Sequence, residues 1–370
     1  MTSDTTMLFP AAFLGRPLLG SPTSGPGAGR PPGAATVETS SPAVHGGDAL
    51  PAAPDPDRAR PLSRDRVPVP APQEPNTRSE SQATIVCIAN QKGGVGKTTT
   101  AVSLAAALAQ LGARVLLVDL DPQGNATTGI GLRAEEGEPS SYGVLLGGLA
   151  VSEARRSTAI DGLHLLPSSL DLAGAEVELV PAFSRELKLR RALEPVRDEY
   201  DVILIDCPPS LGLLTVNALV AADQVLVPIQ CEYYALEGLG QLMRTVQLVG
   251  DNLNRGLELG GVVLTMFDGR TNLAQQVVDE VRGYFGARAY ATVIPRTVRL
   301  SEAPSFGQPI TTFDPHSRGS RAYQRLAAEV ADRLALGIAP IEESALDRLL
   351  ASAAERATSP AQDDQHKEQE

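Results

Sequence analysis

The run Lys92-Gly93-Gly94-Val95-Gly96-Lys97-Thr98-Thr99 decides the fold. It follows a continuous apolar stretch, Thr84–Ile88, which is typical of a strand buried on both faces, and it opens a predicted helix that ends near Leu111. Three glycines let a phosphate approach the backbone, and the N-terminus of the helix supplies oriented N–H donors. Lys97 is placed to reach the β- and γ-phosphates, and the Thr98 hydroxyl is placed to bind Mg²⁺. The run therefore predicts a nucleoside-triphosphate site, in preference to an ordinary glycine-rich turn.

Strands and helices alternate on the C-terminal side of this loop. Further buried strands are predicted at 115–118, 163–166, 202–205, 225–229, 262–266 and 291–294, and helices at 185–199, 236–249, 273–285 and 318–334. This alternation predicts an α/β fold with a doubly wound, mostly parallel sheet. Ligands of such sheets bind beyond the carboxyl ends of the strands, where Asp119, Asp121 and Asp206 fall.

The two ends of the chain differ from its middle. The first eighty residues hold 15 of the 29 prolines, and residues 1–82 are predicted to be a disordered Pro/Ala/Gly-rich extension. Residues 83–338 have the size of one large domain, and residues 339–370 are expected to form a helix and a polar tail. The apolar segment 7–14 has no basic residue before it, and no run approaches the length that crosses a bilayer, so neither a targeting signal nor a membrane span is predicted.

Charge and cysteine content exclude some classes of function. The net charge of -12 argues against a uniformly basic coat for nucleic acid, although a local basic patch remains compatible with it. Cys87, Cys207 and Cys231 have no metal-ligand spacing, which favours reduced thiols in a cytoplasmic protein. The four scattered histidines indicate no zinc cluster.

The glycine-rich run also resembles the deviant Walker A box, Lys-Gly-Gly-x-Gly-Lys-Thr-Thr. Gln91 stands where the standard box has its first glycine, and Lys92 follows it. The deviant box marks the superfamily of ParA partitioning ATPases, MinD and the nitrogenase iron protein. The resemblance implies that Lys92 reaches the nucleotide of a partner subunit in an ATP-sandwich homodimer, as an arginine finger does. It also assigns the nucleotide contacts to the whole box, from Lys92 to Thr99.

Two acidic segments extend the resemblance. The segment Asp119–Asn125 is similar to the switch I region of ParA proteins, which implies that Asp121 orients the attacking water and lies near the metal. The segment Ile203–Ser210 resembles their Walker B region, which implies that Asp206 holds Mg²⁺. Without the resemblance, each aspartate would be an ordinary acidic strand end.

Three later segments point to the chromosomal, Soj-like branch of ParA. They are residues 230–238, 265–272 and 294–305. By this resemblance Pro295 contacts the adenine, Asn217 makes a further nucleotide contact, and Arg270 and Arg299 bind DNA. Eight arginines and five acids lie between Gly260 and Arg325, so this span is basic although the whole chain is acidic. Arg282 and Arg288 are expected to cap helices or pair with acids instead.

The resemblance implies an ATPase that uses ATP and Mg²⁺ and partitions a chromosome or a plasmid. The ATP-bound homodimer would bind double-stranded DNA without sequence preference, and a ParB-type centromere-binding partner would stimulate hydrolysis. Such a protein is expected in the cytoplasm on the nucleoid.

Four alternatives stay open at this stage. A MinD-like membrane-associated ATPase would need a basic face on the C-terminal helix, and here that face is acidic on balance, so no stable membrane association is expected. A redox ATPase would need two exposed cysteines, of which Cys231 supplies one. A metabolic relative, such as a cobyrinate synthase, is not expected to carry the Arg270 and Arg299 segments. A scaffold that only binds nucleotide would not need Lys97, Asp121 and Asp206.

Overall fold

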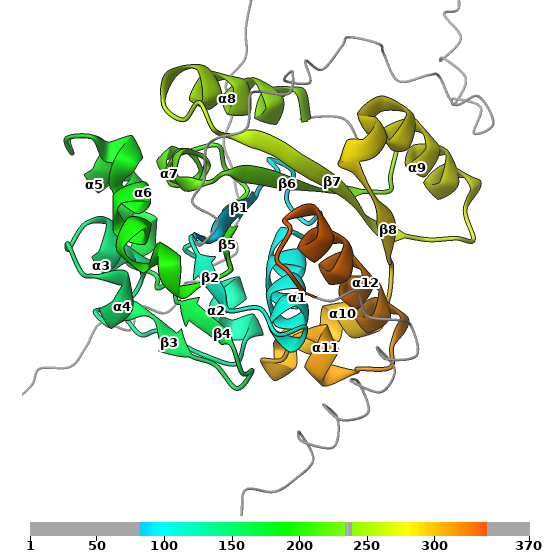
Figure 1. Ribbon diagram of the computed structural model, residues 1–370, viewed down its shortest axis with the longest axis horizontal. Coiled ribbons are helices and arrows are strands. Elements are labelled where there is room, and N and C mark those ends of the chain that lie inside the picture. Colours follow the sequence, from blue (N-terminus) through cyan, green and yellow to red (C-terminus); the bar gives the residue numbers. More distant parts are fainter. Residues whose placement is uncertain (1–81, 234, 236–238, 339–370) are drawn as a thin grey trace, which may run out of the picture. The chain divides into compact units, whose positions relative to one another are not determined.

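An eight-stranded sheet forms the centre of this computed structural model, which describes residues 82–338 except 234 and 236–238 (Figure 1). The strand order is β3-β4-β2-β5-β1-β6-β7-β8. The strands are β1 (Thr84–Ile88), β2 (Val115–Asp119), β3 (Arg156–Ser157), β4 (Leu163–Leu166), β5 (Val202–Asp206), β6 (Gln224–Gln230), β7 (Glu258–Phe267) and β8 (Ala289–Pro295). The short edge strand β3 is antiparallel to β4, and every other neighbouring pair is parallel. The predicted doubly wound, mostly parallel sheet is confirmed.

Helices cover both faces of the sheet. On one face lie α1 (Lys97–Gln110), α2 (Asn125–Gly129), α10 (Val298–Glu302), α11 (Ile310–Phe313) and α12 (Arg318–Arg333). On the other lie α3 (Ser141–Leu145), α4 (Val151–Ala154), α5 (Leu172–Leu179), α6 (Lys188–Leu193), α7 (Leu213–Ala221), α8 (Leu239–Asn252) and α9 (Asn272–Phe285). The central strands contribute to both cores, because successive side chains point to opposite faces: in β1, Ile85 and Cys87 enter one core, and Val86 and Ile88 enter the other. The continuous apolar runs of the sequence thus have a direct physical cause.

The helix that follows the glycine-rich loop is the most deeply buried. Its small residues from Ala101 to Ala109 pack on the sheet and on α12, and the Thr100 hydroxyl lies 3.1 Å from the Tyr323 hydroxyl. The helix ends at Gln110 with Leu111 as its C-cap, and Gly112 follows with a φ of 99°, a conformation that favours glycine. Figure 1 shows α1 and α12 side by side in front of the sheet.

One predicted helix is wrong in its continuity. Residues 185–199 form a 3₁₀ turn (Arg185–Leu187), α6 and a second 3₁₀ turn (Glu194–Glu199), in place of one helix. Pro195 lies in the first turn of the last segment, where its missing N–H interrupts α-helical hydrogen bonding. The helix expected after Asp206, which carries Asn217, is α7, whereas the short helices α2, α3, α4, α5, α10 and α11 were not predicted.

Some predictions lie outside the described residues. These are the extension 1–82, apart from Gln82, and the C-terminal helix and tail 339–370. Within the described part of the chain, no helix is both long enough and apolar enough to cross a membrane.

Candidate nucleotide and magnesium site

The glycine-rich loop is held in place from both sides. Asn90 donates from Nδ2 to the Pro228 carbonyl at 2.7 Å and accepts the Lys92 N–H at 2.9 Å. On the other side, the Thr265 hydroxyl donates to the Val95 carbonyl at 2.9 Å. Sequence reasoning missed Asn90 and Thr265 as supports, because only the pairing of β1 with β6 and of β6 with β7 brings them to the loop.

The glycines of the loop have distinct roles. Gly94 and Gly96 have φ values of 74° and 87°, which other residues adopt only with strain. Gly93 has no such φ, and a methyl group added there would meet nothing within 4 Å. Gly93 and Gly94 are exposed, so the open side of the loop is free within this chain.

Lys97 turns back over the loop. Its side chain is buried, and Nζ donates to the Lys92 carbonyl at 3.3 Å. Burial lowers the pKa of Lys97, while the charges of Asp206 and Asp121 act in the opposite direction. The lysine is therefore a cation held among carboxylates beside the loop, as a phosphate-binding lysine requires.

Asp119 and Asp206 end adjacent strands at the same level. They are paired in register between β2 and β5, and Leu120 N donates to the Asp206 carbonyl at 3.0 Å. Asp121 follows two residues later, and its Oδ1 accepts the Gln123 N–H at 3.0 Å. The predicted convergence of the three aspartates at the carboxyl edge is thus what the structure shows.

Asp119 is fully buried and holds the backbone on which Asp121 lies. Its Oδ1 accepts the Asp121 N–H at 3.1 Å, and its Oδ2 accepts both the N–H and the hydroxyl of Thr127 at 2.8 and 2.7 Å. Burial raises the pKa of Asp119 to about 6, although the Thr127 and Asp121 hydrogen bonds oppose the shift. Asp119 is therefore committed to hydrogen bonds within the protein, and Thr127 is a support that the sequence did not reveal.

Asp206 has the opposite character. It is fully buried, and neither carboxylate oxygen has a hydrogen-bonding partner. Burial and the charge of Asp119 raise its pKa well above the ordinary value, and the nearby Thr98 hydroxyl opposes this shift. An unpartnered buried carboxylate beside a hydroxyl fits a divalent cation, and Asp206 and Thr98 are the residues that would hold Mg²⁺.

The protein alone does not supply a complete magnesium cage. Among the described residues, no group of three or more His, Cys, Asp or Glu side chains could hold a metal ion. Mg²⁺ bound by one carboxylate and one hydroxyl would complete its shell with phosphate oxygens and water, which is how magnesium enters nucleotide sites. The donor set therefore fits a magnesium–nucleotide complex better than a metal without nucleotide.

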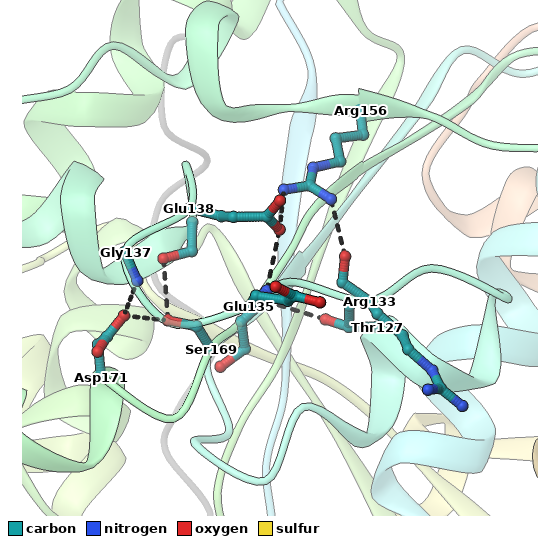
Figure 2. A network of polar contacts seen from close by, with 10 residues as sticks. Thr127, Arg133, Glu135, Gly137, Glu138, Arg156, Ser169 and Asp171 are labelled. Atoms are coloured by element: carbon teal, nitrogen blue, oxygen red, sulfur yellow. Dashed lines mark hydrogen bonds and ion pairs between the residues drawn. The ribbon is translucent and has the colours of Figure 1, made fainter. Parts of the chain in front are cut away.

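A polar network extends from this edge to the margin of the sheet (Figure 2). The Thr127 hydroxyl accepts the Ser168 N–H at 3.0 Å, and Ser169 Oγ donates to Asp171 at 3.1 Å. Asp171 also accepts the Gly137 N–H at 3.0 Å. Figure 2 shows Arg156 bridging Glu138 and the Arg133 carbonyl in the same network. The residues beyond β4 are thus joined to the loop that carries Asp121.

Lys92 lies at the entrance of the site. Its side chain is about one-third exposed, and Nζ is 3.8 Å from the carboxylate of Glu232 in the same chain. A contact with a second subunit would need this ammonium group to leave Glu232.

The two predicted nucleotide contacts, Asn217 and Pro295, remain predictions. Asn217 is buried on α7, its Nδ2 donates to the Arg185 and Leu213 carbonyls, and its Oδ1 accepts the Leu189 N–H. These hydrogen bonds give Asn217 a structural role, because they join α7 to α6 and to the turn before it. Pro295 ends β8 opposite Phe267 of β7. It does not line the cavity of about 250 Å³ that lies between α1, α2 and the segment from Leu300 to Ile310.

The two predicted DNA-binding arginines lie on the surface and are paired with acids. Arg270 has 88% of its side chain exposed and bonds to Asp268 at 2.6 Å. Arg299 is 58% exposed and lies 3.1 Å from Glu302 and 3.3 Å from Asp314. Arg282 donates to the Ala291 carbonyl of β8 at 2.8 Å, which is a structural contact but neither the helix cap nor the ion pair that was expected.

The structure corrects the prediction that Cys231 is exposed. Cys231 is buried and not exposed, and burial raises its pKa to about 12. Cys87 and Cys207 are also buried, with their sulfur atoms 3.3 Å apart. Thiols buried in apolar surroundings are inert, so the three cysteines give no support to a redox centre.

Comparison of the chain with known proteins supports the interpretation of this site as a nucleotide site. A family model described as an AAA domain matches residues 83–259. The chain is 58% identical over 247 residues to the sporulation initiation inhibitor protein Soj of Bacillus subtilis. The aligned residues make up 67% of this chain and 98% of that protein. The chain belongs to the ParA/Soj family.

Two further proteins place the family in context. The chromosome partitioning protein ParA of Myxococcus xanthus is 55% identical over 249 residues, which span 67% of this chain and 88% of that protein. The solved structure of cobyrinic acid a,c-diamide synthase from Mycobacterium smegmatis, with bound ADP and magnesium, is 42% identical. It has a TM-score of 0.59 and covers 67% of this chain and 94% of that one. The ParA/Soj resemblance expected from the sequence is confirmed.

Proposed function

We propose that this chain is an ATPase that partitions a chromosome or a plasmid. With ATP it forms a homodimer that binds double-stranded DNA without sequence preference on the nucleoid, in the cytoplasm. A ParB-type partner stimulates hydrolysis and so releases the dimer. The identity to Soj and ParA relatives over nearly their whole length supports this function. The observation that carries it is the buried Lys97 beside the unpartnered carboxylate of Asp206, at the mouth of an open glycine-rich loop.

Each residue of the site has a separate role in ATP hydrolysis. Lys97 and the loop amides bind the β- and γ-phosphates, and Thr98 and Asp206 hold Mg²⁺, which neutralises charge on the phosphates when bound. Asp121 orients the attacking water in line with the γ-phosphate. Asp119 and Thr127 act through Asp121, because they fix the backbone on which it lies.

The open side of the loop favours close approach of a second subunit. Gly93 and Gly94 are exposed and Lys92 stands beside them, so a facing subunit could come near without meeting side chains. In that arrangement Lys92 leaves Glu232 and contacts the nucleotide of its partner.

Two other functions are less well supported. The C-terminal segment 339–370, in which a MinD-like membrane ATPase would need an amphipathic helix with a basic face, lies outside the described residues, and its sequence is acidic on balance. The structurally similar diamide synthase is named for a different activity. ATP-dependent DNA binding separates partitioning from both, because neither alternative needs it.

Substitution of Gly93 tests the dimer. Gly93→Val meets no neighbour within one chain and needs no unusual backbone angle, so nucleotide binding should persist while the second subunit is blocked. Size-exclusion chromatography should give an ATP-dependent dimer for the parent and a monomer for Gly93→Val. Gly283→Val on α9, whose added carbon also meets nothing within 4 Å, is the control for valine substitution itself. A normal ATP-dependent dimer of Gly93→Val would contradict the sandwich.

A further inference from the structure

Strand β7 contains a strained residue at the edge of the sheet where the nucleotide loop lies. Among the residues that the structure describes, three other than glycine have a positive φ: Ser184, Met266 and Ala335, with values of 50°, 54° and 50°. Ser184 precedes a 3₁₀ turn and Ala335 follows the C-cap of α12, and left-handed residues are common at such ends. Met266 instead lies within a strand, where this conformation is strained for a residue with a long side chain.

Met266 forms part of a β-bulge between β7 and β8. Leu264 is paired with Val293, and Phe267 is paired with Pro295. Three steps along β7, from 264 to 267, therefore oppose two steps along β8, from 293 to 295. Bulges are frequent beside active sites, where they redirect a side chain, and a left-handed bulge residue is usually glycine. The sequence thus keeps a costly residue at a position that glycine would fill without strain.

Thr265, the residue before the bulge, holds the nucleotide loop. Its hydroxyl donates to the Val95 carbonyl at 2.9 Å, and its methyl carbon lies 3.9 Å from the position that a side chain on Gly96 would take. Its carbonyl accepts the Cys231 N–H at 3.0 Å, which fixes the loop after β6. Thr265 therefore joins two of the loops at the carboxyl edge of the sheet.

Phe267, the residue after the bulge, holds a third loop. Its carbonyl accepts the Arg296 N–H at 2.9 Å, and β7 is still paired with β8 there. The pairing of β7 with β6 ends at Thr265, so the bulge lies where β7 leaves one neighbour and keeps the other. A shift of one residue turns every side chain of a strand to the opposite face. Loss of the extra residue would therefore turn the Thr265 hydroxyl away from Val95 or displace the Arg296 contact.

We propose that Met266 is a positioning residue for the nucleotide loop, and that the loop depends on its left-handed backbone and not on its side chain. The hydrogen bonds of Thr265 and Phe267 on either side offset the strain. The bulge directs the Thr265 hydroxyl to the Val95 carbonyl and so keeps the loop in the shape that binds phosphate. This inference rests on the proposed function and names a residue that acts on its nucleotide site from β7.

Substitutions at position 266 separate the backbone from the side chain. Met266→Ala removes the side chain and Met266→Gly also removes the strain, so both should bind a fluorescent ADP analogue with Mg²⁺ within about twofold of the parental affinity. Met266→Val has a β-branched side chain that the left-handed conformation disfavours strongly, so the chain should lose the bulge. The affinity of Met266→Val should fall about fivefold or more, because the strain then opposes the bound shape of the loop.

Two further comparisons exclude a general loss of structure. Ala335→Val makes the same change at a left-handed residue that follows α12, and it should lower the stability but keep the parental nucleotide affinity. Thr265→Val removes the hydroxyl and should weaken the ADP analogue as Met266→Val does. Thr265→Ser keeps the hydroxyl and should retain most of the affinity.

Urea unfolding without nucleotide tests the strain itself. Within a strand, glycine normally lowers the stability relative to alanine, but at a left-handed position this order is reversed. Met266→Gly should therefore unfold at a higher urea concentration than Met266→Ala. This comparison needs no valine variant, so it still tests the proposal if Met266→Val does not fold.

The outcomes that would overturn the proposal are distinct. Parental affinity of Met266→Val or of Thr265→Val would show that the nucleotide loop does not depend on the bulge. An affinity of Met266→Ala as low as that of Met266→Val would show that the side chain is what matters. Lower stability of Met266→Gly than of Met266→Ala would show that position 266 is not strained. A parent that binds no nucleotide would contradict the proposed function instead, so the two failures can be told apart.

Discussion

Buried side chains fix the position of Asp121, the aspartate proposed to orient the attacking water. Asp121 has its position because Asp119 binds its N–H, and Asp119 is fixed in turn by two hydrogen bonds from Thr127. The Thr127 hydroxyl also accepts the Ser168 N–H, so one buried oxygen joins two segments. A small displacement of Asp121 should therefore follow from a change at a residue that never touches the nucleotide.

Thr127→Val keeps the shape of the side chain and removes the hydroxyl. Because Asp119 loses a donor and Asp121 its fixed position, ATP turnover should fall about tenfold or more with little change in KM. Thr127→Ser keeps the hydroxyl and should retain most of the parental rate. Steady-state phosphate release measures both. A serine variant as slow as the valine variant, or a valine variant with parental turnover, would show that the hydroxyl does not position Asp121.

Asp206 should destabilise the nucleotide-free protein at neutral pH. Its pKa is raised above the ordinary 3.8, and that of Asp119 is raised to about 6, so the folded state holds protons more tightly than the unfolded chain. The free energy of unfolding should therefore fall as the pH rises from about 4 through 6 and above. Asp206→Asn should flatten this decline and stabilise the protein at pH 7.5 by about 1–3 kcal/mol.

Urea unfolding at pH 5 and pH 7.5, without nucleotide and with a chelator, measures this effect. The same variant should lose the extra stability that Mg²⁺ and ATP give to the parent, because the carboxylate proposed to bind the cation is gone. A variant less stable than the parent at pH 7.5 would show that Asp206 is satisfied in a way that the structure does not reveal.

At the scale of elements, the start of β1 depends on one ion pair. Arg197 bonds to Asp223 at 2.6 Å and to the Ala83 carbonyl at 3.0 Å, and Asp223 accepts the Ile85 N–H at 2.8 Å. The pair is mostly buried, whereas the pair between Arg114 and Asp201 has half of its arginine side chain exposed. Removal of Arg197 should leave a poorly hydrated carboxylate beside the central strand.

Arg197→Leu should therefore cost about 3 kcal/mol of stability, and Arg114→Leu about 1 kcal/mol or less. Chemical denaturation of both variants tests the difference. Equal losses would mean that the Arg197 pair has no special role at the edge of β1.

The strands and helices that could be predicted are those in which a local pattern of apolar residues indicates burial. Val202–Asp206 and Leu163–Leu166 appear as apolar runs because both faces of the sheet are covered. The short α5 was missed, because its apolar residues are not confined to one face and give no helical periodicity. Residues 185–199 were read as one helix, because the periodic pattern concealed the break at Pro195.

The site follows the same rule. The glycine-rich loop, Asp121 and Asp206 could be predicted, because their chemistry lies in short local motifs. The supports Asn90, Thr127 and Thr265 could not, since each acts through a partner that the topology brings close. The bulge at Met266 could not be predicted either, because the apolar run 262–266 has the pattern of an ordinary buried strand.

At the scale of the whole molecule, DNA binding must come from a local surface. The chain carries a net charge of -12, so the proposed phosphate contacts would need exposed arginines such as Arg270 and Arg299. Both are exposed, and both are paired with carboxylates that DNA phosphates would have to displace. The double change Arg270→Glu and Arg299→Glu should abolish DNA binding and leave ATP-driven dimerisation intact. Arg114→Glu, another exposed and paired arginine, is the matched control. Parental binding by the double variant would exclude this surface.

Binding to unrelated duplexes, compared without nucleotide, with ADP and with ATP, tests the central claim most directly. A dimer doubles the phosphate contacts on one surface, and electrostatic contacts weaken as salt rises. Gel shifts at two salt concentrations should therefore show binding only with ATP and Mg²⁺, much weaker at the higher salt and independent of duplex sequence. Equal binding in all three nucleotide states, or no binding in any, would contradict a partitioning ATPase that is switched by ATP.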